Sequence, residues 1–249
     1  MVCVVTMHEK PDLKDPVLIE GLPGIGFVAN IAALHIIRNL KAELFAEINC
    51  SSFQDFAVTV EGGQTRHPIN ELYYYKGEKK QRDLLILYGN TQALTSTGQY
   101  ELCGKILDLS EELGCHYVIT LGGLKREREI KKPKLYFAAT DEEMAKELID
   151  AGAAVIKGQI FGVAGLLVGI GRLRGFRGFC LLAETLGLYP DIVAAHKILN
   201  VICEMLNLKV SLDLLEDTVD ETHKLLKSFG LLDQSQKERK KESGFRWFV

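Results

Sequence analysis

The sequence has few of the features that mark membrane, secreted or metal-binding proteins. Its longest apolar stretches, such as residues 160–170, are interrupted by glycine and are shorter than the roughly 20 residues of a membrane-spanning helix. Residues 1–15 place Glu9, Lys10 and Asp12 after a short apolar run, which is the wrong order for a signal peptide. We therefore expect a cytoplasmic protein that does not bind a membrane.

The cysteines also lack any metal or redox spacing. All six are scattered, mostly inside apolar runs, and no two form a C-x-x-C motif. Cysteines of this kind in a reducing compartment are buried thiols more often than disulfides. We expect thiols, and no zinc site, at these positions: Cys3, Cys50, Cys103, Cys115, Cys180 and Cys203.

Neither charge nor histidine spacing indicates a nucleic-acid or metal site. The chain has 30 Lys plus Arg against 33 Asp plus Glu, a net charge of -3, so no overall basic footprint for nucleic acid exists. The histidines form no H-E-x-x-H pattern, there is no G-x-S-x-G elbow, and a lone helical histidine such as His196 is expected to be structural. We expect no cofactor, no metal and no catalytic residues.

Short β-branched runs alternate with longer segments of helical period, which predicts an α/β fold. We expect one three-layer αβα sandwich with a mostly parallel sheet in residues 1–229, including a helical C-terminal extension, and a separate flexible tail in residues 230–249. The predicted strands are residues 17–20, 44–49, 57–60, 72–76, 83–88, 117–121, 135–139 and 179–184. The predicted helices are residues 25–39, 96–113, 141–150, 161–173, 190–206 and 211–228.

A glycine turn follows the first predicted strand, with Gly21, Gly24 and Gly26 in the order G-L-P-G-I-G. From Gly24 it matches G-x-G-x-x-A, and Glu47 lies 21 residues after Gly26, which is the spacing of a dinucleotide-binding fingerprint. The alternative is that the glycines serve close packing of a strand against a helix. Pro23 within the turn favours this alternative.

A second glycine-rich segment has small residues at helical spacing. The segment predicts a helix whose glycines let another backbone approach closely, within the subunit or at an oligomer interface. These glycines are Gly162, Gly165 and Gly169. Three arginines follow at positions 172, 174 and 177, and we expect them to be solvated rather than to bind phosphate.

Two carboxylates stand at the ends of apolar strands. Glu20 and Glu184 are the ones we consider for a site, because open α/β sheets bind ligands at the carboxyl ends of their strands.

Several motifs in order resemble the archaeal proteasome-assembly chaperone family. They are the Gly21–Gly26 turn, residues 51–55 with Phe53, the strand D-L-L-I-L-Y-G-N from Asp83, T-L-G-G from Thr120, G-x-x-G-L-L from Gly162, and Glu184-Thr185 before Tyr189-Pro190. The resemblance covers residues 17–206. It implies a fold similar to nucleoside phosphorylases without their chemistry, a homo-oligomer, and a role as a chaperone for assembly of the proteasome α ring.

The resemblance also gives the C-terminus a specific interpretation. In this family and in proteasome activators, a terminal hydrophobic residue, tyrosine and any residue insert between proteasome α subunits, where a lysine meets the terminal carboxylate. Trp247, Phe248 and Val249 match this pattern except that phenylalanine replaces tyrosine, which removes a hydroxyl hydrogen bond.

Two hypotheses from different classes follow. The first is a non-enzymatic assembly chaperone that binds proteasome α subunits through Trp247, Phe248 and Val249. The second is a nucleotide-binding or ATP-grasp-like ligase that uses the turn from Gly21 to Gly26 with Glu47 or Glu184.

Overall fold

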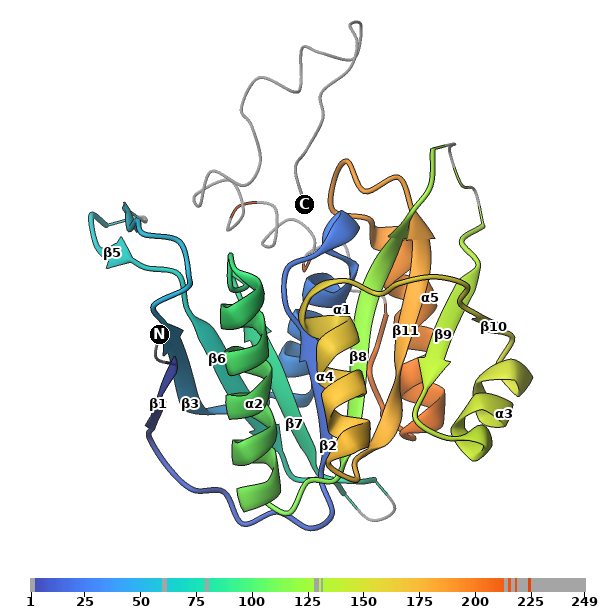
Figure 1. Cartoon of the computed structure of the whole chain (residues 1–249), viewed down its shortest axis with the longest axis horizontal. Coiled ribbons are helices and arrows are strands. Elements are labelled where there is room, and N and C mark those ends of the chain that lie inside the picture. Colours follow the sequence, from blue (N-terminus) through green and yellow to red (C-terminus); the bar gives the residue numbers. More distant parts are fainter. Residues whose placement is uncertain are drawn as a thin grey trace, which may run out of the picture.

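A computed structural model describes residues 3–59, 62–78, 81–127, 130, 132–212, 215, 218 and 224. Within these residues nine strands form one sheet in the order β1-β3-β6-β7-β2-β8-β11-β9-β10 (Figure 1). The strands of this sheet are β1 (Cys3–Met7), β2 (Val17–Gly21), β3 (Glu43–Cys50), β6 (Asn70–Tyr75), β7 (Leu84–Gly89), β8 (Tyr117–Lys125), β9 (Leu135–Ala139), β10 (Ala154–Val155) and β11 (Arg177–Thr185). Strands β4 (Val58–Thr59) and β5 (Thr65–Arg66) form a separate pair.

The sheet is mixed, with a parallel centre. Strands β7, β2, β8 and β11 are neighbours and run parallel, whereas β1, β3, β6 and β7 pair antiparallel, as do β11 and β9. The expected parallel order therefore holds at the centre and between β9 and β10, and fails at the other strand pairs. The short connection between β6 and β7 is one reason, because a short loop can join only antiparallel strands.

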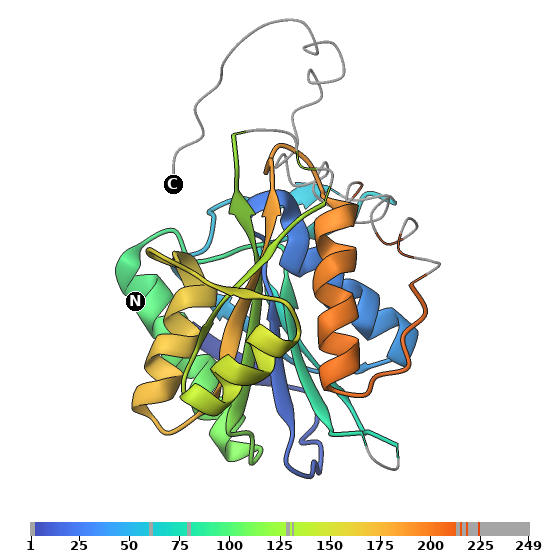
Figure 2. The same ribbon diagram turned by 90° about the vertical axis from the view of Figure 1, so that its right-hand side faces the viewer.

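Helices cover both faces of the sheet, which gives the expected three layers (Figure 2). Helices α1 (Val28–Leu40) and α5 (Ile192–Met205) pack on one face, and α2 (Ser96–Glu112) and α4 (Gly162–Leu173) on the other. Helix α3 (Glu142–Asp150) lies beside the edge strands β9 and β10. Strands β2 and β7 are buried along their whole length, as expected for apolar strands covered on both faces. None of the helices in the described residues is both long and apolar enough to cross a membrane.

Some elements differ from the expected ones. The helix expected at residues 25–39 is divided into a short 3-10 turn, η1 (Ile25–Phe27), and α1, because Gly26 and Phe27 have positive φ angles of 65° and 51°. Strands β1, β5 and β10 were not expected, and the last two contain only two residues each. Of the helix predicted for residues 211–228, only residues 211, 212, 215, 218 and 224 are described, and residues 230–249 lie outside the described part.

The segment after α5 is fastened to α1 by His35. The Nε2 atom of His35 lies 2.7 Å from the carbonyl oxygen of Ser211, and its Nδ1 lies 3.0 Å from the hydroxyl of Thr218. A carbonyl only accepts hydrogen bonds, so we assign the proton of the neutral ring to Nε2, and Nδ1 then accepts from Thr218. Leu215, only 2% exposed, packs into the core between these two contacts.

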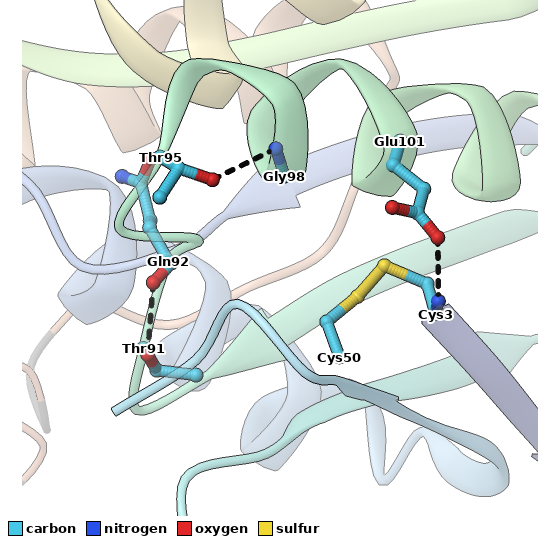
Figure 3. Close-up of a disulfide and its surroundings, with 7 residues drawn as sticks. All are labelled: Cys3, Cys50, Thr91, Gln92, Thr95, Gly98 and Glu101. Carbon is cyan, nitrogen blue, oxygen red and sulfur yellow. Dashed lines mark hydrogen bonds between the residues drawn. A yellow bond between two sulfur atoms is a disulfide. The ribbon is translucent and has the colours of Figure 1, made fainter. Parts of the chain in front are cut away.

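The cysteine prediction was wrong at two positions. Cys3 and Cys50 form a disulfide across β1 and β3, with their Cα atoms 4.1 Å apart (Figure 3). The error follows from the missed strand β1, because only its antiparallel register places Cys3 opposite Cys50. The Cys3 amide donates to the Glu101 carboxylate of α2 at 2.9 Å, which fixes the edge strand a second time. The other four cysteines are free.

The disulfide predicts a redox-dependent stability. It links residues 47 positions apart, and a loop of that length corresponds to about 4 kcal/mol in the chain-entropy account. Cys3→Ser should lower the free energy of unfolding by about this amount in oxidising buffer and hardly at all with a reductant present. Urea unfolding under both conditions measures the difference.

Cys203→Ser is the matched control, because Cys203 is a free thiol. Its effect should be the same in both buffers. If Cys3→Ser also destabilises the protein equally in both buffers, the two sulfurs are not bonded in solution.

Candidate functional site

The carboxyl ends of the parallel strands meet at one edge of the sheet, where a ligand site is expected in an open α/β fold. This edge, which we call the carboxyl edge, lies at the top of Figure 1. The glycine turn follows β2 here, Asn90 to Gln92 follow β7, and Glu184 stands near the end of β11.

Packing explains two of the three glycines in the turn. A side chain at Gly21 would overlap Ala33 of α1, so the glycine lets this helix cross β2 closely. Gly26 has a positive φ, and a Cβ there would lie 2.7 Å from Thr185 Oγ1. Gly24 has open space around its Cα and an extended φ of -156°, so neither strain nor space requires glycine there.

The carboxylate of the dinucleotide fingerprint is not beside the turn. Glu47 lies on β3, and strands β6 and β7 separate β3 from β2. At the usual strand spacing this is about 14 Å. The Glu47 carboxylate instead lies 3.6 Å from His8. The structure therefore does not bring Glu47 and the glycine turn together.

Glu184 is used within the fold. Its carboxylate accepts hydrogen bonds from Arg126 Nε at 2.9 Å, from the Lys134 amide at 3.1 Å and from the Tyr136 hydroxyl at 3.2 Å. Burial opposes the charge of Glu184, but these bonds, with that of Arg126 foremost, hold its pKa below the usual range. Glu184 thereby fastens the loop between β8 and β9.

Glu20 is buried and only partly satisfied. One carboxylate oxygen accepts from the Leu22 amide at 2.9 Å, and the other has no hydrogen-bond partner in the described part of the chain. Its neighbours Leu18 and Leu22 belong to the core under α2 and α4, so the alternation of strand side chains places Glu20 there too. Burial raises the pKa of Glu20 to about 7, although the Leu22 hydrogen bond opposes the shift.

Several polar side chains at this edge were not among the predicted site residues. Asn30 of α1 donates to the carbonyls of Gly21 and Gly89 and so joins the ends of β2 and β7. Gln92 donates to the Pro23 carbonyl at 2.6 Å and accepts from the Val163 amide at the start of α4. An asparagine inside an apolar helical run is the one signal that could have identified Asn30.

The glycines of α4 have different surroundings. Gly162 has a positive φ of 75°, and a side chain at Gly165 would overlap the carbonyl of Ile160 in the same chain. Gly169 is exposed, with open space beyond its Cα. Leu173, one turn further, is 88% exposed. The outward face of α4 around Gly169 therefore carries the apolar Leu173 beside the exposed Arg172, whereas Gly165 serves packing within the subunit.

The arginines after α4 make ion pairs rather than an anion site. Arg174 binds Asp108 at 2.8 Å and Glu111 at 2.7 Å, both on α2. Arg177 binds Asp141 and Glu143 in the same way at the start of α3. Arg172 ends α4 and is exposed.

One further expected site has no structural account. Trp247, Phe248 and Val249 lie outside the described residues. Among the residues that are described, no three His, Cys, Asp or Glu side chains gather in a way that could hold a metal ion.

Comparison with known proteins gives consistent results. A model of the PAC2 family matches residues 18–229. The uncharacterized protein MJ1210 of Methanocaldococcus jannaschii is 35% identical over 220 residues, which cover 87% of this chain and 84% of the relative.

Two solved structures from Pyrococcus furiosus are similar along almost their whole length. PbaB, described as an archaeal proteasome activator, is 35% identical with a TM-score of 0.82, and the match covers 92% of this chain and 98% of PbaB. PbaA, described as an archaeal homolog of proteasome-assembly chaperone, has the same fold at 24% identity and a TM-score of 0.75, with coverage of 95% and 100%.

Glu20 predicts a specific pH dependence of stability. Its pKa is about 7 in the folded chain against an ordinary 4.5, so the folded state holds the proton more tightly than the unfolded state. The stability that the folded state gains by holding this proton is complete below the ordinary pKa of 4.5. It is lost as the pH rises through the folded-state pKa of about 7. Glu20→Gln stays neutral, so relative to the wild type it should gain up to about 3 kcal/mol above pH 8.

Urea unfolding of both proteins near pH 5 and above pH 8 measures this gain. A difference in unfolding free energy that does not change between the two pH values would contradict the buried, protonated carboxyl.

Proposed function

The chain belongs to the PAC2 family, and we propose that it is a proteasome-assembly chaperone that binds proteasome α subunits as a homo-oligomer. One observation carries the proposal: the chain shares sequence and fold with PbaB, an archaeal proteasome activator, over 92% of its length. The likeness to the proteasome-assembly chaperone homolog PbaA supports it. We also propose that the fold is like that of nucleoside phosphorylases and that the chain has a helical C-terminal extension.

The chemistry of the carboxyl edge supports a binding protein rather than an enzyme. Glu184 is held by three hydrogen bonds within the fold, and Glu47 lies far from the glycine turn. A nucleotide-binding or ligase-like enzyme built on the turn from Gly21 to Gly26 is thus the weaker alternative. A thermal-shift screen with ATP, NAD, NADP, FAD and purine nucleosides tests it, because a ligand of the native state raises the melting temperature.

In this proposal the C-terminal residues Trp247, Phe248 and Val249 engage the α ring. Each buried side chain contributes a few kcal/mol, and ordering the tail cancels much of it, so a single tail binds weakly. Several tails on one oligomer make the later contacts effectively intramolecular, which raises the avidity by orders of magnitude. The oligomer is therefore part of the mechanism.

We place the contact between subunits at the outward face of α4. Gly169 and the strongly exposed Leu173 supply an apolar surface there, with space for a second backbone beside Gly169. Gly162 and Gly165 lie on the same helix but are shaped by contacts within the subunit.

The tail makes a first prediction about binding. Deleting residues 247–249 should weaken binding to proteasome α subunits by about tenfold or more, because every tail contact of the oligomer is lost together. Phe248→Tyr restores the hydroxyl of the family pattern and should tighten binding by about fivefold, the value of one hydrogen bond. Native gels with labelled α subunits report both changes. Unchanged co-migration after the deletion would exclude the tail mechanism.

The outward face of α4 makes a prediction about assembly. Gly169→Glu should dissociate the oligomer, because it puts a charge at the centre of the proposed contact. Gly169→Ala is the control, since a methyl group fits the open space and favours the helix. Sedimentation velocity of both variants measures the effect. Oligomers of equal size in the two variants would place the interface elsewhere.

A further inference from the structure

An apolar surface lies at the carboxyl edge where α5 begins. Its members come from η1, from the segment between β11 and α5 and from the first turn of α5, and they are about half exposed: Ile25 (45%), Leu188 (57%), Tyr189 (49%) and Val193 (51%). The first two of these segments are in contact, because a Cβ at Gly187 would lie 2.7 Å from Cγ2 of Ile25. The Asp191 amide also donates to the Gly26 carbonyl at 2.9 Å. We call these four residues the α5 surface.

The C-terminal segment is anchored close to the α5 surface. His35 of α1 holds Ser211 and Thr218, as described above. Burial lowers the pKa of His35, and the nearby charges of Arg38 and His196 lower it further. Helix α1, which carries His35, packs against α5, which carries His196. Val193 precedes His196 by about one helical turn, in the direction of the carboxyl edge. Figure 2 shows α1 and α5 side by side on this face of the sheet.

The remaining chain is long enough to return to this surface. The rise from Val28 to His35 is about 10 Å along α1, and Ile25 lies in the 3-10 turn just before this helix. Lys224 and Phe245 are separated by 21 positions in the sequence, which span about 25 Å as an average coil. The last five residues are Phe245, Arg246, Trp247, Phe248 and Val249, four of them apolar.

We propose that residues 245–249 dock on the α5 surface of their own chain when no partner is bound. The match is one of chemistry and of distance, since an apolar surface lies within reach of an apolar terminal segment. A short tether keeps the local concentration of this segment in about the millimolar range, so that weak apolar contacts are enough to hold it. This inference rests on the proposed function for its consequence: docking would cover the side chains that engage the α ring and make partner binding compete with it.

Trp247 is the only tryptophan of the chain, so its fluorescence reports on this segment alone. The experiment compares acrylamide quenching of Trp247 in the full-length protein, in Val193→Asp, in Leu188→Asp and in a synthetic peptide of residues 237–249. Ile149→Asp on α3 is the matched control, because Ile149 is 53% exposed, close to Val193 at 51%. Circular dichroism confirms that each variant is folded.

We expect the wild type and Ile149→Asp to be quenched about threefold less than the peptide, and Val193→Asp and Leu188→Asp to approach the peptide. Quenching of the wild type equal to that of the peptide would overturn the proposal. Equal protection in all variants would also overturn it, because the segment would then lie on another surface. The protection must persist when the protein is diluted until it sediments as a monomer, since loss on dilution would assign the segment to a second copy.

No proteasome subunit is present in this experiment. Its failure therefore leaves the proposed function standing, and a failure of the binding experiments above leaves the docking result standing.

Discussion

Burial of the central strands on both faces is the constraint on which the rest of the structure depends. Strands β2 and β7 have no exposed residue, so every helix of the two outer layers must bring an apolar side to the sheet. Polar side chains within the central strands are therefore few, and Thr120 of β8 satisfies its hydroxyl by donating to the Ala164 carbonyl of α4. The carboxyl edge receives the ends of β7, β2, β8 and β11, and with them the loops that vary most easily in such folds.

Polar side chains at this edge are mostly used to hold the fold together. Asn30 joins two strand ends, Gln92 joins the glycine turn to α4, and Glu184 fastens a loop. Glu20 is buried beneath α2 and α4, and this burial raises its pKa to about 7. The residues that remain exposed on the α5 surface are apolar. The carboxyl edge therefore combines polar groups that are already bonded within the fold with an apolar surface at the start of α5.

The sequence predicts elements with a strong hydrophobic periodicity well. It predicts poorly the elements that form only because a strand pairs with a distant strand. Strand β9 was predicted with its observed bounds, because an apolar run between charged segments has few alternatives. Strand β1 was missed, and with it the disulfide, because five residues near the end of the chain acquire a partner only through the register with β3. The glycine turn matched a dinucleotide fingerprint by spacing alone. Spacing could not reveal that β6 and β7 would separate Glu47 from it. Motifs taken in order along the chain identified the family, which single motifs could not do.

The proposed chaperone function requires a complex between this protein and proteasome α subunits. Native mass spectrometry of the two proteins mixed at micromolar concentration tests it most directly, since it counts the copies of each chain in every species. The proposed function predicts assemblies that contain several copies of this chain together with α subunits. If only free α subunits and free copies of this chain are observed over a range of salt and protein concentrations, the proposed chaperone function is contradicted.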